Sequence, residues 1–418
     1  MKLIKEENKQ SVDLLLVLAV FVLARICCPA LSNIPIFSMA FTFAYGAAFV
    51  LLYLISVKSM PWQDFYLMVA AFGYTLYICI RGFIGGAELF SKDAFNAYII
   101  VFLTMIYLWA KRRPRATKVL LFRLILAALL FNYIYSIVVL FFDPNASRAS
   151  AALSVLERSP YDILNAVGSF DAVYGGLSVI LILLMMRRIM KEKNIKNKTT
   201  LLVLILAFLF IVMASYGTAL VLLVVALALF AAKKNKVLSI LLMISVILLL
   251  ILHEPIGRLL IDLSSRITFS ETVSGKMGDI GFMLEHFEAA GTYAGDAGRS
   301  VRMTWSLETF KQYPIFGGFG IMGEKIGGHS ELLDMLGQYG FVGFSFAFAY
   351  FICLYKNIRG QLVFKEMKTV WKIIVLIFVI SSVLNPSLYA LQMMPMILMI
   401  PLASAYLEMC EDQKALGE

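Results

Sequence analysis

The residues best suited to chemistry lie in two adjoining segments between positions 298 and 343. The first segment holds Arg299 and Arg302 and runs into a glycine-rich turn at Pro314. Residues three apart share one face of a helix, and two guanidinium groups there suit a pyrophosphate, which accepts bidentate hydrogen bonds. The alternative is a pair of interfacial arginines that contact lipid headgroups or acidic neighbours.

The second segment contains His329, one of three histidines in the chain. We expect it at the N-terminal mouth of a membrane helix, where the positive end of the helix dipole disfavours the imidazolium. A neutral histidine is available as a general base. Glu331 and Asp334 follow within about one helical turn and could orient the histidine or a sugar hydroxyl. A capping or structural histidine is the alternative interpretation.

The residues around these side chains predict the elements that hold them. Apolar positions within Val301–Phe310 predict a short amphipathic helix at the membrane interface, which Pro314 and the glycines would end. Gly337, Gly340 and Gly343 leave a thin helix face on which another helix or a lipid chain could pack closely.

The rest of the chain is built for a membrane. It has 418 residues, of which 61% are hydrophobic and 15% charged, whereas a soluble chain carries about a quarter charged residues. Apolar runs of roughly 17–25 residues recur, and such runs cross a bilayer as helices. We predict an all-α integral membrane protein with about twelve transmembrane helices, forming a single polytopic domain over residues 1–418. The expected spans are Ser11–Cys28, Ile34–Val57, Phe65–Ile80, Ala94–Ala110, Thr117–Phe142, Ile163–Met186, Thr199–Ala214, Ser215–Ala232, Val237–His253, His329–Tyr355, Thr369–Asn385 and Tyr389–Met409.

The distribution of charge predicts the orientation. The net charge is +10, and the basic loops all fall on one side of the predicted spans, which the positive-inside rule makes cytoplasmic together with both termini. The first span would act as a signal anchor. Asp143–Asp162 and residues 254–328 then form extracytoplasmic loops, the larger between the ninth and tenth helices. A basic patch for anionic lipid or nucleic acid is the alternative. We expect membrane lipids and no nucleic acid as partners.

Several kinds of chemistry have no signature in the sequence. No GxxxxGK[ST] loop, no GxGxxG after a strand and no DxD pair is present. The five cysteines show neither CxxC pairing nor zinc-ligand spacing with the histidines. We therefore predict no metal site and no cofactor. A substrate activated as a lipid pyrophosphate would need none of these motifs.

The two segments together resemble a known family. The run R-x-x-W-x-x-x-x-F-x-x-x-P-I-F-G-G-F-G from Arg302, followed by G-H-S-E-L-L-D-M-L-G-Q-Y-G-F-V-G, is similar to the signature of the O-antigen polymerase and ligase superfamily. The matching positions are Pro314, Gly318 and Gly320 in the turn, and His329, Ser330, Gly340 and Gly343 in the helix.

The resemblance implies a metal-independent glycosyltransferase. It would polymerise undecaprenyl-pyrophosphate-linked oligosaccharide, both donor and acceptor, into O-antigen or capsular polysaccharide at the outer face of the bacterial cytoplasmic membrane, with a chain-length regulator protein as a further partner. His329 matches the family base that deprotonates the acceptor. Arg302, with Arg299 second, matches the arginine that holds the departing pyrophosphate. Ser330, Glu331 and Asp334 are expected near the substrate.

One family element is missing. Many members carry Ser-Arg-Gly where two membrane helices meet, whereas here Ala214–Ala219 places Tyr216 at the arginine position. Arg81, Arg148 or Arg158 could supply the second donor-binding arginine.

Three other functions compete with the polymerase. An O-antigen ligase would share the signature and transfer the glycan to a lipid A core. The residues of the histidine helix, with Glu331-Leu-Leu and Gln338-Tyr-Gly, resemble those of the polymerases more. A lipid flippase or transporter would mark its path with charges buried in mid-helix, whereas Arg25, Arg81 and Arg123 lie near helix ends. The peptidoglycan polymerases of the shape, elongation, division and sporulation family use an outer-loop aspartate, and the histidine motif argues against them.

Overall fold

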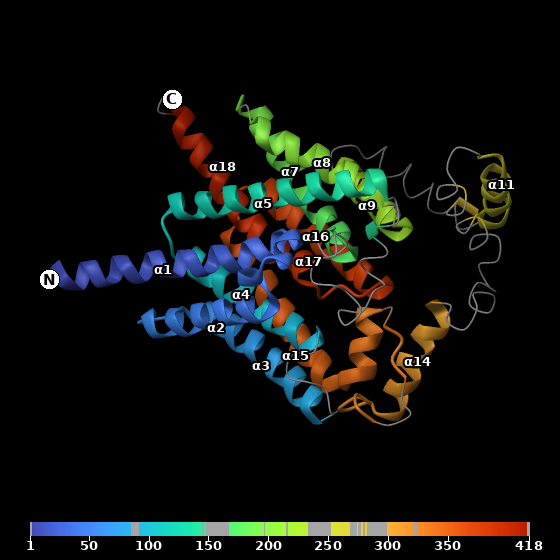
Figure 1. Ribbon diagram of the computed structural model, residues 1–418, viewed down its shortest axis with the longest axis horizontal. Helices are drawn as coiled ribbons and strands as arrows, with labels where there is room; N and C mark the ends of the chain where they lie inside the picture. Colours follow the sequence, from blue (N-terminus) through green and yellow to red (C-terminus); the bar gives the residue numbers. More distant parts are fainter. Residues whose placement is uncertain are drawn as a thin grey trace. The chain divides into compact units, whose positions relative to one another are not determined.

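The described part of the chain is entirely helical. The computed structural model describes residues 2–84, 92–143, 146–147, 167–195, 197–214, 216–232, 252–267, 274, 277–278, 281, 299–321, 325–328 and 330–415, and within them every element is a helix (Figure 1). The chain divides into two compact units. Unit 1 comprises Met1–Ala214, Val342–Val375 and Ser387–Glu418, and unit 2 comprises Ser215–Phe341 and Leu376–Pro386.

Unit 1 is a bundle of long apolar helices. It contains α1 (Lys2–Cys27), the 3-10 turns η1 (Pro29–Asn33) and η2 (Pro35–Phe37), α2 (Met39–Ser56), α3 (Trp62–Ile84), α4 (Lys92–Lys111), α5 (Arg115–Phe142), α7 (Phe170–Glu192), α8 (Lys198–Ala214), α17 (Ala390–Met394), the π-helical turn η6 (Pro395–Met399) and α18 (Ile400–Ala415). Two helices cross between the units along the chain, α15 (Glu331–Gln361) and α16 (Lys365–Leu384).

Within the described residues, seven helices are long and apolar enough to cross a membrane, as expected of a helical membrane protein. They are Met39–Ser56, Trp62–Ile84, Arg115–Phe142, Phe170–Glu192, Glu331–Gln361, Lys365–Leu384 and Ala390–Lys414. Four shorter apolar helices coincide with other predicted spans: Leu14–Cys27, Phe95–Lys111, Lys198–Ala214 and Thr218–Ala231. The predicted span Val237–His253 lies outside the described residues except at its last two positions. The count of twelve therefore stays a prediction.

The centre of unit 1 is formed by α7 and the Ala390–Lys414 span. Both bury most of their residues, whereas each of the other five long spans buries fewer than half. Side chains that point away from this centre are large and apolar, as expected for surfaces in contact with lipid.

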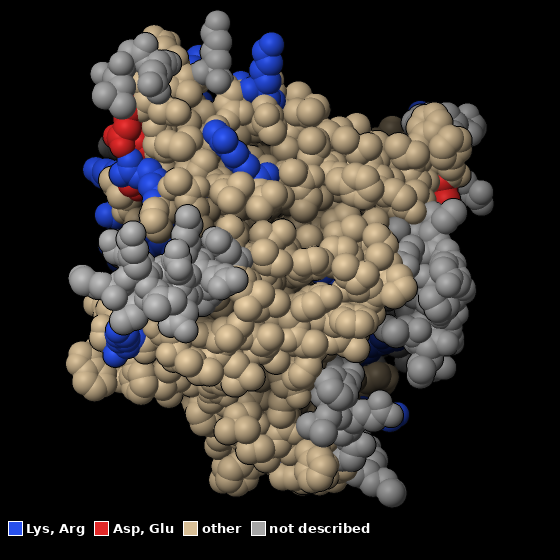
Figure 2. Space-filling model, turned by 60° about the vertical axis from the view of Figure 1, so that its left-hand side comes forward, with Lys and Arg blue, Asp and Glu red and all other residues tan. Residues whose placement is uncertain are grey.

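Charged residues of the predicted basic loops gather at one end of unit 1. Lys111 donates to the buried Asp64 carboxylate at 2.6 Å, and Asn357 donates to the same oxygen at 2.9 Å. Arg115 pairs with Glu408 at 3.2 Å, and Lys193 pairs with Glu411. Figure 2 shows acidic and basic side chains together on one edge of the molecular surface, with uncharged residues covering most of that view. The assignment of this end to the cytoplasm stays a prediction.

Unit 2 contains α9 (Gly217–Ala232), α11 (His253–Arg266) and α14 (Arg299–Gln312), together with the first residues of α15 and the last of α16. A helix ends just before Pro314, as the sequence predicts. The described parts of the predicted 254–328 loop thus include two helices, α14 and nearly all of α11.

Candidate functional site

The helix that follows His329 is broken at Gly340. This residue has φ 63° and ψ −167° inside α15, a conformation essentially restricted to glycine. In a regular helix the Phe341 N–H would donate to the carbonyl four residues earlier. Here it donates to the Pro314 carbonyl at 2.8 Å instead. The helix predicted over His329–Tyr355 corresponds to α15, which begins two residues later, at Glu331, and is kinked at Gly340.

The turn after α14 replaces the hydrogen bonds that the kink removes. The Gly318 N–H donates to the Gly337 carbonyl at 2.8 Å, and the Phe319 N–H donates to the Gln338 carbonyl at 3.2 Å. A Cβ on Gly317, which has φ +75°, would lie 2.2 Å from the Gln338 carbonyl oxygen. The proline–glycine turn and the glycine helix are therefore one backbone unit, although they are separate motifs in the sequence.

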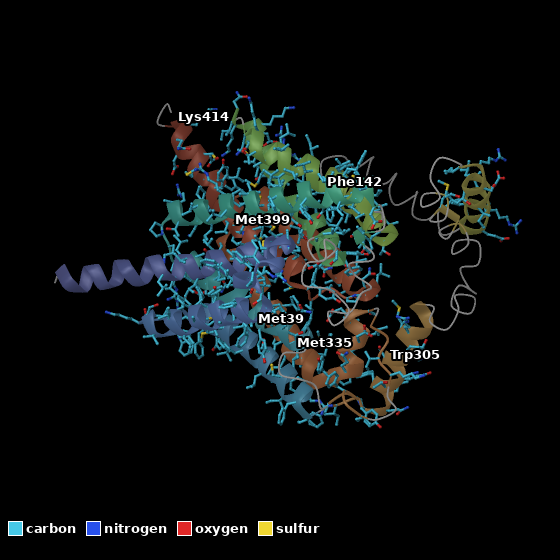
Figure 3. All side chains as sticks on the ribbon, in the orientation of Figure 1. Met39, Phe142, Trp305, Met335, Met399 and Lys414 are labelled. Atoms are coloured by element: carbon cyan, nitrogen blue, oxygen red, sulfur yellow. The ribbon has the colours of Figure 1, made fainter. Side chains whose placement is uncertain are left out.

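Helices α14 and α15 pack closely at Gly337. A Cβ there would lie 2.7 Å from the carbonyl oxygen of Ser306. The Ser306 hydroxyl donates to the Oδ1 of Asp334 at 2.5 Å, one turn before the glycine. Of the two alternatives left open for the glycine face, a helix is what packs there. Figure 3 marks the two neighbours with Trp305 on α14 and Met335 on α15.

The segment before His329 runs along α14. The Thr309 hydroxyl donates to the Lys325 carbonyl at 2.9 Å, and the Gly327 N–H donates to the Ser306 Oγ at 2.9 Å. A Cβ on Gly327 would lie 2.1 Å from the Arg302 carbonyl oxygen, so only glycine fits. The Lys325 ammonium lies 5.2 Å from the centre of the Trp305 ring. Two cationic residues, Arg302 and Lys325, thus belong to adjacent stretches of one packed element.

His329 itself lies outside the described residues, but both of its neighbours are placed. Gly328 has φ +70°, a left-handed conformation that favours glycine. Ser330 is fully buried and caps α15, since its Oγ accepts from the Leu333 N–H at 3.3 Å. The Ser330 N–H donates to the Oδ2 of Asp334 at 3.0 Å.

One buried carboxylate therefore anchors the chain on both sides of His329. Asp334 is 8% exposed, and its two oxygens accept from Ser306 and from Ser330. Ser306 in turn accepts from Gly327. The Ser306–Asp334 pair therefore holds Gly327 against α14 and Ser330 at the start of α15.

Removing this carboxylate should destabilise the histidine segment. We expect Asp334→Ala to lower the free energy of unfolding by about 1–3 kcal/mol, because the Ser306 hydroxyl and the Ser330 N–H lose their acceptor in a buried place. Thermal unfolding in detergent measures the change. In the double variant Ser306→Ala/Asp334→Ala, the loss in free energy of unfolding should be smaller than the sum of the two single losses, because both residues belong to one network. Fully additive losses would contradict the network.

Four of the predicted site residues lie in the described part of this unit. Arg302 is half-buried on α14, and Glu331 opens α15 with its N–H donating to the Asn385 carbonyl at 3.3 Å. Ser330 and Asp334 belong to the same unit and have protein partners, which gives them structural roles. Contact of these four with substrate stays a prediction.

The roles of the remaining predicted arginines stay predictions. Arg299 is the first residue of α14, but its side chain lies outside the described residues. Arg81 is in α3 of unit 1. Arg148 and Arg158 lie outside the described residues.

Three residues at this site carry no sequence prediction: Ser306, Lys325 and Asn385. Ser306 follows Arg302 by four positions, so helical periodicity alone could have placed both on one face. Asn385 is 2% exposed, and within the described residues its side-chain Nδ2 has no hydrogen-bond partner. Nothing in the local sequence signals this, because its proximity to Glu331 depends on how α16 packs.

Comparisons with known proteins add no relative. No known family model matches the chain, and no curated protein matches it.

Proposed function

We propose that the chain is a glycosyltransferase that polymerises lipid-pyrophosphate-linked oligosaccharide at the extracytoplasmic face of the cytoplasmic membrane. The resemblance of the 302–343 segments to the O-antigen polymerase and ligase superfamily supports it. The observation that carries it is the Ser306–Asp334 network, because it links Gly327 and Ser330, on either side of His329, to the helix that bears Arg302. A site that holds a base and a cation in fixed relation is what such a transfer requires.

The proposed reaction needs no metal. His329 takes the proton of an acceptor hydroxyl, and the resulting oxygen nucleophile attacks the anomeric carbon of the donor. The bond between that carbon and the pyrophosphate oxygen breaks, and the bonding electrons leave with undecaprenyl pyrophosphate. Arg302, Arg299 and Lys325 would stabilise the negative charge that grows on the leaving group.

Loss of the Arg302 guanidinium should slow the transfer. We expect Arg302→Ala to lower the rate by about 10²–10³-fold, the usual cost of removing a group that stabilises transition-state charge. Arg302→Lys should recover only part of it, because an ammonium cannot make the bidentate contact. The assay is elongation of undecaprenyl-pyrophosphate-linked oligosaccharide by the purified protein in detergent, read as a ladder on a gel.

The matched control is Arg266→Ala, an exposed arginine of α11 in the same unit. It should keep wild-type elongation. Unchanged elongation by Arg302→Ala would refute the assignment of the donor-binding arginine.

The same assay separates the alternatives. Elongation of lipid-linked units identifies a polymerase. Transfer to a lipid A core alone would identify a ligase. Movement of the lipid across a vesicle membrane without any new glycosidic bond would identify a flippase or transporter.

A further inference from the structure

Two amide side chains are buried without partners inside unit 1. Asn132 of α5 is 0% exposed and Gln392 of α17 is 4% exposed. Neither the oxygen nor the nitrogen of either amide has a hydrogen-bond partner within the described residues. An unsatisfied buried polar group costs about 1–3 kcal/mol, and more where no water reaches it. Polar residues kept at such a cost in membrane spans mark functional sites by default.

The two helices that carry these amides, α5 and α17, both contact the beginning of α7 or the residues just before it. A Cβ on Gly175 would lie 2.3 Å from the Leu391 carbonyl oxygen and 3.4 Å from the backbone nitrogen of Gln392, so the backbones of α7 and α17 are in contact. One turn beyond Asn132, the Ser136 hydroxyl accepts from the Gly168 N–H at 2.8 Å, just before α7. Helix α1 packs against both α5 and α17. Four helices therefore converge at this end of the bundle (Figure 1).

A guanidinium lies at the same end. Arg25 of α1 is half-buried, and its Nε–H donates to the Phe37 carbonyl at 3.1 Å. Asp171, in the first turn of α7, is near enough to act electrostatically on this guanidinium. The Asp171 carboxylate itself accepts from the Ser169 hydroxyl and the Ala172 N–H, both at 2.9 Å.

The backbone and the neighbouring rings also distinguish this end. The π-helical turn Pro395–Met399 follows Gln392 within one span. Such turns are rare in proteins overall, and those that occur are often at functional sites. The Phe170 ring lies 4.4 Å from the Tyr174 ring and 6.1 Å from the Tyr389 ring, centre to centre. Interrupted membrane helices line binding sites in many membrane proteins.

The chemistry of these groups selects the ligand. The amides offer donors and acceptors together, and the arginine adds donors. An oxyanion would leave both amide carbonyls unsatisfied, and a cation would be repelled by the arginine. A hydroxyl is donor and acceptor at once, so a ligand with several hydroxyls can satisfy both kinds of group, and the aromatic rings offer flat apolar faces to its C–H groups.

We propose that unit 1 carries a saccharide-binding site where α1, α5, α7 and α17 converge, with Arg25, Asn132 and Gln392 as hydrogen-bonding residues. The site does not rest on the proposed transfer reaction, since a protein that only carried a glycolipid would use it equally. The sugar could be free or linked to a lipid, and the experiment separates these sources.

The test is thermal unfolding of the full chain in detergent, carried out on His329→Ala so that no transfer occurs. The probes are a water-soluble oligosaccharide, the same oligosaccharide on undecaprenyl pyrophosphate, and undecaprenyl phosphate. Gln392→Met and Asn132→Leu should raise the midpoint without ligand, because each removes an unsatisfied amide, and should weaken sugar-induced stabilisation at least about tenfold in apparent Kd. Gln63→Met, at an exposed glutamine of the same unit, should change neither.

The site is supported if either sugar-bearing probe stabilises the protein and this stabilisation is weakened by each of three substitutions: Gln392→Met, Asn132→Leu and Arg25→Gln. Response to the soluble sugar identifies recognition of the glycan alone, and response only to the glycolipid shows that the lipid is also required. Equal stabilisation of variants and parent, no stabilisation by either sugar, or an equal response to undecaprenyl phosphate would overturn it. A protein that binds sugar in this way and yet forms no glycosidic bond would refute the proposed transferase and leave this site standing.

Discussion

His329→Ala is expected to lower glycosyl transfer by about 10²–10⁴-fold while leaving the protein folded and inserted. The methyl group of alanine cannot take the proton of the acceptor hydroxyl, so the attacking oxygen would have to react in its weakly nucleophilic neutral form. The fold should tolerate the change, because the anchors of this segment are the N–H groups of Gly327 and Ser330 and not the imidazole. The measurement is the elongation rate of lipid-linked oligosaccharide in detergent, with thermal unfolding run in parallel.

The control for this variant is His253→Ala, at the first residue of α11 in the same unit. It should elongate at the parent rate. Product ladders of normal length and rate from His329→Ala would remove the histidine from the role of base. A loss of the folded protein, seen as a lowered midpoint, would assign it a structural role instead.

Gly340→Ala is expected to destabilise the protein by about 3–5 kcal/mol, the largest stability effect of any substitution considered. Alanine at φ +63° is strained, and its Cβ would lie 2.4 Å from the Ile315 carbonyl oxygen. Because this oxygen belongs to the turn that completes the hydrogen bonds of the kink, the turn must move away. We expect the variant to lose elongation together with stability, since the kink orients the start of α15.

Gly360→Ala is the matched control in the same helix. A Cβ there would meet no atom within 4 Å, and the position is helical. It should leave the midpoint unchanged or raise the free energy of unfolding by about 0.5–1 kcal/mol, because alanine is the better helix former. Equal effects of the two substitutions would show that Gly340 has no special role.

Much of the architecture could be predicted from the sequence because its cause is local. An apolar run long enough to cross a bilayer must form a helix wherever it lies, so the spans over Phe65–Ile80 and Thr117–Phe142 were placed to within a few residues. Pro314 ends α14 because proline lacks the N–H that a helix needs, whatever surrounds it. The count of spans and their orientation stay predictions.

The candidate site was predictable in composition but not in geometry. Residue types and spacing indicate Arg302 and Asp334, and the family resemblance adds Ser330; in unit 2 the Ser330 N–H donates to Asp334, which also accepts from Ser306, four positions after Arg302. Their division of labour could not be predicted, since the Ser306 hydroxyl that binds Asp334 lies 28 positions earlier. The same holds for Asn385, which reaches Glu331 only through the packing of α16.

The sequence by itself determined that this chain is helical, that its long helices suit a membrane, and which short segments carry reactive side chains. Hydropathy and turn preference act over a few neighbouring residues, so they can be evaluated along the chain. Only the tertiary structure decided that α15 breaks at Gly340 and that one carboxylate anchors both sides of His329. It also decided that the buried amides of Asn132 and Gln392 have no hydrogen-bond partner among the described residues. Each of these depends on which distant backbone or side chain lies alongside, and packing alone sets that.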